Sequence, residues 1–291
     1  MKNVGNFTTT AFLTLTLCVS VVSAGAPMGL SIATLAERQW SLGGEFAFEQ
    51  SDMEAFGTTT ETYELGPSTY AYAQSLDVED FETNMVFATF GYGLCDNWNI
   101  FVRAGVADGA DDVILHPQTS ASGEDRFAFD GDMGLAWGVG TRATFARSGP
   151  WTFGGLVQVT WFDPGDSDFA YGDPADAVEG AVAGDAQIKY WQTQVALTVA
   201  CQIDTWTFWA GPFLQYIEGD LDLEGQIILD DEGIGYFKSC ADIEESSQLG
   251  AHFGANWGFA NQWNLSIEGQ ITGDSWLVGI GTTFIPDTFG Q

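Results

Sequence analysis

Residues 96–109, "DNWNIFVRAGVADG", contain the pattern on which the fold rests. A polar turn is followed at once by Trp98, and apolar residues then alternate with small or polar ones. Alternation with a period of two is typical of a β-strand with one apolar face. The same order of turn, tryptophan and alternating run occurs five times, at intervals of 58, 53, 55 and 57 residues. The five tryptophans are Trp40, Trp98, Trp151, Trp206 and Trp263.

Short polar turns alternate with long polar segments along the chain. The runs between them predict ten strands, at 40–51, 82–95, 98–107, 133–146, 151–162, 187–203, 206–217, 246–260, 263–271 and 275–285. The long segments hold 31 of the 40 acidic residues together with clustered Gly, Pro and Ser, a composition that predicts loops. These segments are 52–80, 108–132, 163–185 and 218–245.

One part of the last long segment has a pattern of its own. Residues 225–237, "GQIILDDEGIGYF", resemble a β-hairpin, with two apolar runs around a polar turn. They predict either two further strands, twelve in all, or an extension of the sheet above a membrane.

The two faces of the predicted strands differ in a way that favours a membrane. One face is apolar and aromatic, whereas the other carries Gly, Ala, Thr, Gln and Asn with few charges. Strands of about ten residues that are apolar outside and polar inside, with short turns at one end and long loops at the other, are typical of outer-membrane barrels. The sequence therefore predicts an all-β fold, a transmembrane up-and-down antiparallel β-barrel. A soluble β-sandwich is the alternative.

The repeated tryptophan has a place in this architecture. Each one begins a strand next to a short turn, which in such barrels lies on the periplasmic side. An amphipathic ring is most stable at the boundary between membrane and water. We therefore expect a periplasmic aromatic girdle made of Trp40, Trp98, Trp151, Trp206 and Trp263.

The first 24 residues predict export. They combine Lys2, a short apolar core and a small-residue cleavage site that ends at Ala24, which is the pattern of a signal peptide. The expected division is a signal peptide at 1–24, a short N-terminal lead at 25–37, an outer-membrane β-barrel at 38–285 and a tail at 286–291. The expected location is the outer membrane, with its lipids and the barrel assembly machinery as partners.

Five residues beyond each of these tryptophans, a side chain points inward at one common depth. Glu45, Arg103 and Glu268 occupy such positions, and Arg142 lies at a similar height. Because buried ions must be paired, we expect these four residues to form a charge cluster in the lumen, with either a structural or a selectivity-tuning role. The inner polar lining is expected to include Gln158, Gln192, Gln194, His252 and Asn256.

The charge of the chain limits its partners. A net charge of −32 disfavours nucleic acid and attracts cations. The acidic segments are candidate sites for small cations or divalent ions, with solvated loops as the alternative, and none has the full spacing of a calcium-binding loop. With only two histidines and no evident catalytic group, we expect no enzymatic activity, no cofactor and no metal centre. Cys95, Cys201 and Cys240 give no disulfide framework.

Two stretches carry a resemblance to a known family. Residues 129–162 ("FDGDMGLAWGVGTRATFARSGPWTFGGLVQVTWF") and 188–220 ("IKYWQTQVALTVACQIDTWTFWAGPFLQYIEGD") resemble strand pairs of the chlamydial major outer-membrane porins. The shared features are an "AW-x-x-G-x-R" strand, a tight turn and a "YWQ…AL" strand that leads into an aromatic strand. The resemblance implies a general porin, although the chain is shorter and lacks that family's abundant cysteines.

Two functions follow from these expectations. The first is a narrow, cation-preferring porin-like channel for small solutes, with the four charged lumen residues as its constriction. The second is a non-conducting structural or surface-interaction barrel that acts through its acidic extracellular segments. Narrow barrels are mostly filled by side chains, which favours the second, whereas abundant inward glycine favours the first.

Overall fold

The computed structural model describes residues 25–63, 68–117, 125–172, 181–229, 233–273 and 275–286. It contains eleven strands, and no helix in the described residues is long and apolar enough to cross a membrane. The strands are β1 (Trp40–Tyr63), β2 (Ser68–Cys95), β3 (Trp98–Pro117), β4 (Asp125–Ser148), β5 (Trp151–Asp163), β6 (Ser167–Gly172), β7 (Ala181–Ile203), β8 (Trp206–Leu229), β9 (Gly233–Ala260), β10 (Trp263–Ile271) and β11 (Ser275–Phe284). The predicted signal peptide and residues 287–291 of the predicted tail lie outside the described residues.

Ten of these strands form a closed ring. Neighbours in the chain pair antiparallel, β5 pairs with β7, and β1 closes the ring by pairing with β11. The short strand β6 pairs with β7 beyond the end of β5. This ring confirms the predicted up-and-down barrel of about ten strands. Residues 225–229 and 233–237 belong to the paired ends of β8 and β9, where Gly225 lies opposite Phe237. They lengthen the sheet and add no strands to the ring, which is the second of the two alternatives that the sequence left open.

The outer wall of the ring is apolar. Its outward side chains include Leu42, Phe46, Val102, Leu197 and Ile280, each between 46% and 56% exposed. A soluble protein does not expose a continuous apolar band of this kind, whereas an outer-membrane barrel presents one to lipid. Closure of the ring also pairs the backbone groups that an open sheet edge would leave unsatisfied in hydrocarbon. The chain is an outer-membrane-type β-barrel.

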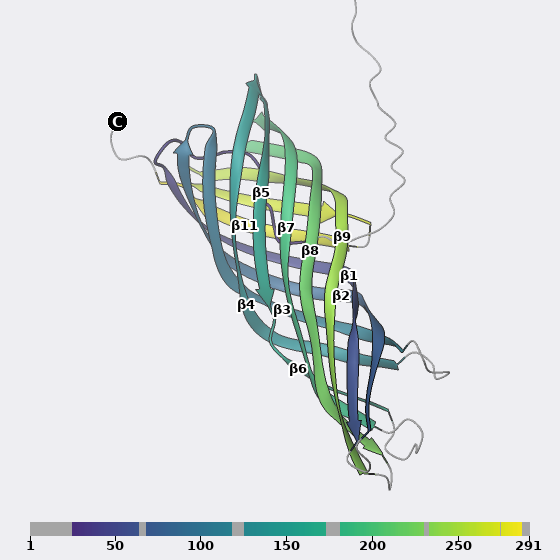
Figure 1. Cartoon of the computed structure of the whole chain (residues 1–291). Helices are drawn as coiled ribbons and strands as arrows, with labels where there is room; N and C mark the ends of the chain where they lie inside the picture. The colour runs from purple at the N-terminus through teal and green to yellow at the C-terminus, as the bar shows by residue number, and fades with distance from the viewer. Residues whose placement is uncertain are drawn as a thin grey trace, which may run out of the picture.

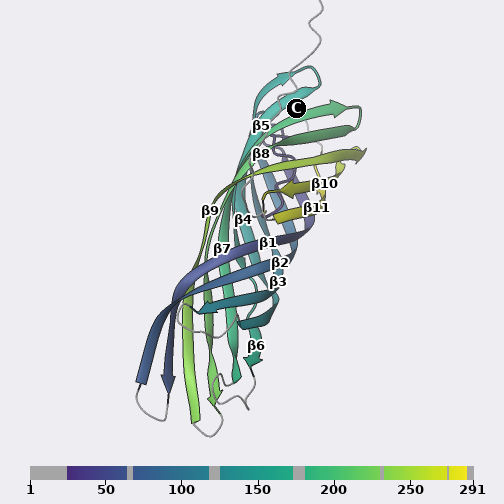
Figure 2. The ribbon, with the colours of Figure 1, turned by 90° about the vertical axis from the view of Figure 1, so that its right-hand side faces the viewer.

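Most described residues of the four long acidic segments lie in strands, which corrects the loop prediction for all of them except 225–237. β1, β2, β8 and β9 continue as paired strands well past the ends of β10 and β11 (Figures 1 and 2). Beyond the β10–β11 hairpin, β1 pairs directly with β9 from Ala55 to Tyr63. We call this part of the molecule the extension. It comprises β6 and residues 52–63, 68–80, 108–117, 125–132, 181–190, 217–229 and 233–245.

Extra residues in three strands mark the boundary between ring and extension. In β2, Val78 and Phe81 pair with Met53 and Ser51, so three steps on β2 oppose two on β1. Equivalent shifts occur between β3 and β4 and between β8 and β9. One extra residue exchanges the two faces of a strand. The shift keeps both Val78 and Phe81 directed inward and buried.

On the extension side of this boundary the interior becomes apolar. The inward side chains of the extension pack into one core with the side chains of the ring that lie nearest to the extension. Each large apolar side chain buried there stabilises the fold by about 1.5–3 kcal/mol. This core explains the failed loop prediction, because apolar inward residues still alternate with the acidic outward ones. It includes Met53, Ala55, Leu76, Val78, Phe81, Phe129, Phe169, Ile188, Ile217, Leu221, Leu223, Ile227 and Ile243.

Candidate functional site

The N-terminal lead, residues 25–37, lies inside the ring and fills much of its lumen. Ala26, Met28, Ile32 and Leu35 are each 7% exposed or less. The backbone of the lead is held by inward side chains from several strands, since a peptide group taken from water needs a protein partner. The lead therefore acts as a packed part of the interior.

The four predicted charged residues meet around this lead. Arg103 Nη1 lies 3.9 Å from Glu45 Oε2 and donates a 2.7 Å hydrogen bond to the carbonyl oxygen of Pro27. Arg142 Nη2 donates to the carbonyl oxygen of Met28 at 2.9 Å. The amide of Gly29 donates to Glu268 Oε2 at 2.5 Å. Consecutive peptide groups of the lead thus contact both guanidinium groups and one carboxylate.

Aromatic rings complete the surroundings of the two arginines. The Arg142 guanidinium lies 4.4 Å from the centre of the Phe101 ring, and that of Arg103 lies 5.2 Å from the same ring. The face of an aromatic ring attracts a cation, most strongly where water is excluded. Arg103 is 3% exposed, so its charge depends on these contacts and on Glu45.

Two predicted glutamines, Gln158 and Gln194, form a network with Gln215 and Gln270, which the sequence did not single out. Gln158 donates to Gln194, and Gln194 donates to Gln215 at 3.1 Å and to Gln270 at 3.0 Å. The network also holds the start of the lead, because Gln192 accepts a hydrogen bond from the Ala26 amide at 2.9 Å. All these glutamine side chains are buried, so amide groups cross the lumen where a pore would need space.

His252 and Asn256 lie elsewhere in the lumen. His252 Nε2 is 3.1 Å from Thr198 Oγ1 and 3.2 Å from the Leu197 carbonyl oxygen. Neither partner is another of the residues predicted for the inner polar lining. Asn256 is partly exposed and lines the cavity described next.

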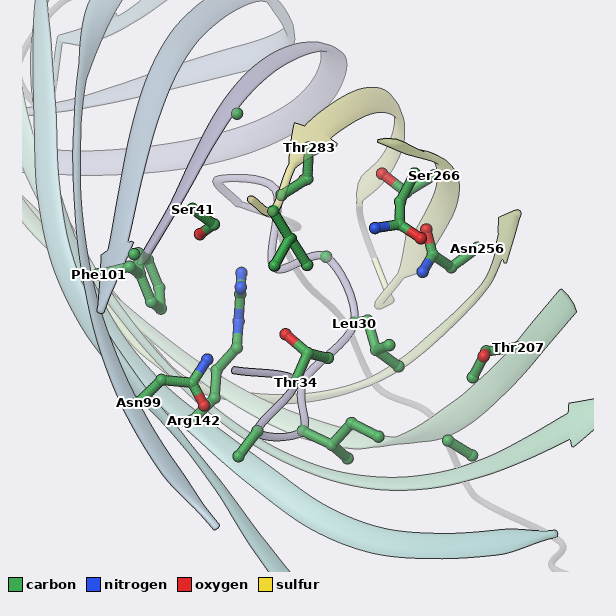
Figure 3. Close-up of a pocket in the computed structure, with 18 of the residues that line it drawn as sticks. Leu30, Thr34, Ser41, Asn99, Phe101, Arg142, Thr207, Asn256, Ser266 and Thr283 are labelled. Carbon is green, nitrogen blue, oxygen red and sulfur yellow. The ribbon is translucent and has the colours of Figure 1, made fainter. Parts of the chain in front are cut away.

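A polar cavity of about 350 Å³ lies between the lead and the strands near the end with short turns. Figure 3 shows Arg142 reaching into it, with Leu30 and Thr34 of the lead close by. Its strand side carries small polar groups, which include Ser41, Asn99, Thr207, Asn256, Ser266 and Thr283. We call this cavity the vestibule.

The apolar core closes the lumen on the other side of the lead. Phe162 joins two walls of the ring, since its ring centre lies 4.7 Å from that of Tyr190 and 6.4 Å from that of Phe87. Phe81 and Phe129 make a further contact at 6.2 Å. A hydrated ion would have to pass the lead and then this core.

The five repeated tryptophans begin β1, β3, β5, β8 and β10, and all are exposed on the outer wall. Their role as an aromatic girdle at the membrane boundary remains a prediction. Cys95 and Cys240 are exposed and Cys201 is partly buried, all as free thiols. Among the residues that the structure describes, no three His, Cys, Asp or Glu side chains are grouped to hold a metal ion.

Acidic groups of the extension perturb one another. A side-chain hydrogen bond with Asp168 and, to a lesser extent, desolvation raise the pKa of Asp185. Burial, followed by the hydrogen bond and charge of Glu61, raises the pKa of Tyr63 to about 12. Lys238 pairs with Glu224 at 3.0 Å, which raises the pKa of the lysine. Residues 230–232 of the acidic cluster between β8 and β9 lie outside the described residues.

The position of the lead is the feature that sequence reasoning missed. Residues 25–36, "GAPMGLSIATLA", contain no charge and have several apolar side chains, in a chain that is otherwise strongly acidic. Such a composition indicates a buried segment. It was available in the sequence, but no period of two or 3.6 assigns it to a strand or helix.

Comparison with known proteins gives likenesses of fold alone. No protein-family model and no curated protein matches the chain. Similar solved structures include the outer membrane protease OmpT from Escherichia coli, with 10% identity, a TM-score of 0.49 and coverage of 84% of this chain and 97% of that one. The outer membrane protein OprG from Pseudomonas aeruginosa has 11% identity, a TM-score of 0.43 and coverage of 88% and 100%. The toluene transporter TbuX from Ralstonia pickettii has 8% identity, a TM-score of 0.40 and coverage of 87% and 90%.

Proposed function

We propose that this protein is a closed outer-membrane barrel that acts through the acidic outer surface of its extension. The observation that carries the proposal is the filled interior, in which the lead occupies the ring and the apolar core occupies the extension side of the lumen. Export by residues 1–24 and contact with outer-membrane lipids belong to the same proposal. It assigns no catalytic role to any residue.

The outer surface of the extension supports a role in interaction. Among the described residues, seven exposed or partly exposed carboxylates lie on β6, β7, β8 and β9 of the extension, against two lysines, Lys189 on β7 and Lys238 on β9. These carboxylates are Asp168, Asp185, Glu218, Asp220, Asp222, Glu224 and Asp242. A surface of one sign concentrates oppositely charged molecules near it, and the effect weakens as salt is added.

A second function, a channel that opens when the lead moves, is favoured by one observation. The interior of the ring near the short turns is polar and includes the vestibule, which a purely structural barrel does not require. In that case Glu45, Arg103, Arg142 and Glu268 would line the opened path and set its ion preference. The apolar core opposes this function, because it would still fill the extension side of the lumen after the lead had moved.

Planar-bilayer conductance separates the two functions. The refolded mature chain and a variant lacking residues 25–37 are inserted in parallel, and insertion is checked by heat-dependent electrophoretic mobility. We expect both to leave the membrane sealed, because the core remains when the lead is removed. Steady conductance steps from the mature chain would refute the closed barrel. Steps from the shortened variant alone, with a cation-biased reversal potential in a salt gradient, would establish the gated channel.

A further inference from the structure

The outer wall has a groove where its outward residues change from apolar to charged. Trp137 pairs with Trp161, and Trp161 pairs with Trp191, so three tryptophans lie side by side on neighbouring strands. One row further along, Lys189 pairs with Asp220, and Asp220 pairs with Asp242. These two rows line a cavity of about 500 Å³, which we call the tryptophan groove.

The aromatic wall of the groove is ordered by stacking. The rings of Trp137 and Trp161 lie 4.2 Å apart with an angle of 10° between their planes. Trp191 packs against Tyr216 at 5.6 Å. An aromatic belt at the membrane boundary accounts for tryptophan at this height. It does not account for a cavity in the size range of small-molecule sites with carboxylates along its rim.

The charge of the groove selects the kind of ligand. Asp163, Glu218, Asp220 and Asp242 line it, and Lys189 is the only lysine or arginine among its lining residues. The ammonium group of Lys189 is 3.8 Å from Asp163 and donates to Gln187 at 2.8 Å, so it is already engaged. Four carboxylates against one ammonium repel anions, whereas a ring face beside carboxylates attracts organic cations.

We propose that the tryptophan groove binds a small organic cation of the quaternary ammonium class from the medium outside the cell. The alkyl groups of the cation contact the faces of Trp161 and Trp191, and its charge is balanced by Asp220 and Asp242. This site rests on the proposal that the protein acts through its outer surface, and it gives that surface a ligand class.

Choline is the probe, and 3,3-dimethylbutan-1-ol, its neutral isostere, is the control ligand. Titration calorimetry uses the refolded mature chain in a nonionic polyoxyethylene detergent, which offers no competing ammonium headgroup. We expect saturable choline binding that weakens as sodium chloride is added, and affinity for the isostere lower by about tenfold or more. Equal binding of the two ligands, or no binding of choline, would overturn the site.

Variants locate the binding. Trp161→Leu keeps an apolar wall and Asp220→Asn keeps the shape, and each should weaken choline about three- to thirtyfold. The matched controls are Trp276→Leu on β11, a tryptophan outside the groove, and Glu82→Gln on β2, an exposed acid outside it, which should leave the affinity unchanged. An equal effect of Trp161→Leu and Trp276→Leu refutes the groove. A sealed bilayer without choline binding refutes only this site, whereas a conducting barrel that binds choline refutes only the closed lumen.

Discussion

At the scale of single residues, Arg103 connects the lead to the barrel. It donates to the Pro27 carbonyl and to Gln158, and it lies beside Glu45. Removing one partner of a buried charged group leaves the other charge unpaired, and this costs more than the pair itself contributes. The contribution of Arg103 to stability is therefore measured by the cost of the unpaired Glu45 carboxylate that its removal would leave in the lumen.

Arg103→Ala should lower the free energy of unfolding by about 3 kcal/mol, because Glu45 loses the buried cation that pairs with it. The measurement is urea unfolding in micelles followed by tryptophan fluorescence. Arg147→Ala serves as the control, since Arg147 is exposed and donates one 3.3 Å hydrogen bond to the Asp96 carbonyl oxygen. If the two variants unfold at the same urea concentration, the buried cluster does not stabilise the barrel.

At the scale of elements, the boundary between ring and extension depends on single extra residues. Asp80 belongs to the extra step in β2 and has a φ of 60°, a conformation that non-glycine residues seldom adopt. Its amide donates to Asp52 at 2.7 Å and its carboxylate accepts from Gln50, so the irregular step is held from β1. The step lets one strand serve lipid-facing and water-facing parts of the sheet.

Deleting Asp80 should prevent the native barrel from forming. The deletion turns Leu76 and Val78 outward relative to Phe81, because a shift by one residue exchanges the two faces of a strand. The folded fraction is measured by heat-dependent electrophoretic mobility after refolding. Asp80→Ala keeps the residue count and should still fold. A deletion variant that refolds as well as Asp80→Ala would show that this step does not set the register.

Sequence reasoning at this scale succeeded for the ring and failed for the extension. The turns at Asp96 and Asp204, each followed by tryptophan, gave the strand starts because local turn chemistry and period two both act there. The strand end at Tyr63 was missed, because its outward polar residues have the composition of loops, whereas the apolar runs of 225–237 had indicated the strand that ends at Leu229. Backbone pairing between neighbouring strands keeps these segments extended, and amino-acid composition does not reveal that pairing.

At the scale of the whole molecule, one sheet has two opposite solvation patterns. The ring is apolar outside and polar inside, and the extension is acidic outside and apolar inside. The sequence placed Glu45, Arg103, Arg142 and Glu268 at one depth, and the structure brings them together around the lead. That the lead is their partner did not follow from the sequence, because the contacts join residues more than 70 positions apart.

The occupied lumen is tested most directly by cysteine accessibility within the lead. Ala26→Cys and Thr34→Cys are made separately in a mature chain whose Cys95, Cys201 and Cys240 are serine. Ala26 is 1% exposed, whereas Thr34 is exposed beside the vestibule. A water-soluble maleimide should therefore label Thr34→Cys in the folded barrel and label Ala26→Cys only after unfolding. Labelling of both at the same rate in the folded barrel would place the lead outside the lumen and contradict the closed barrel.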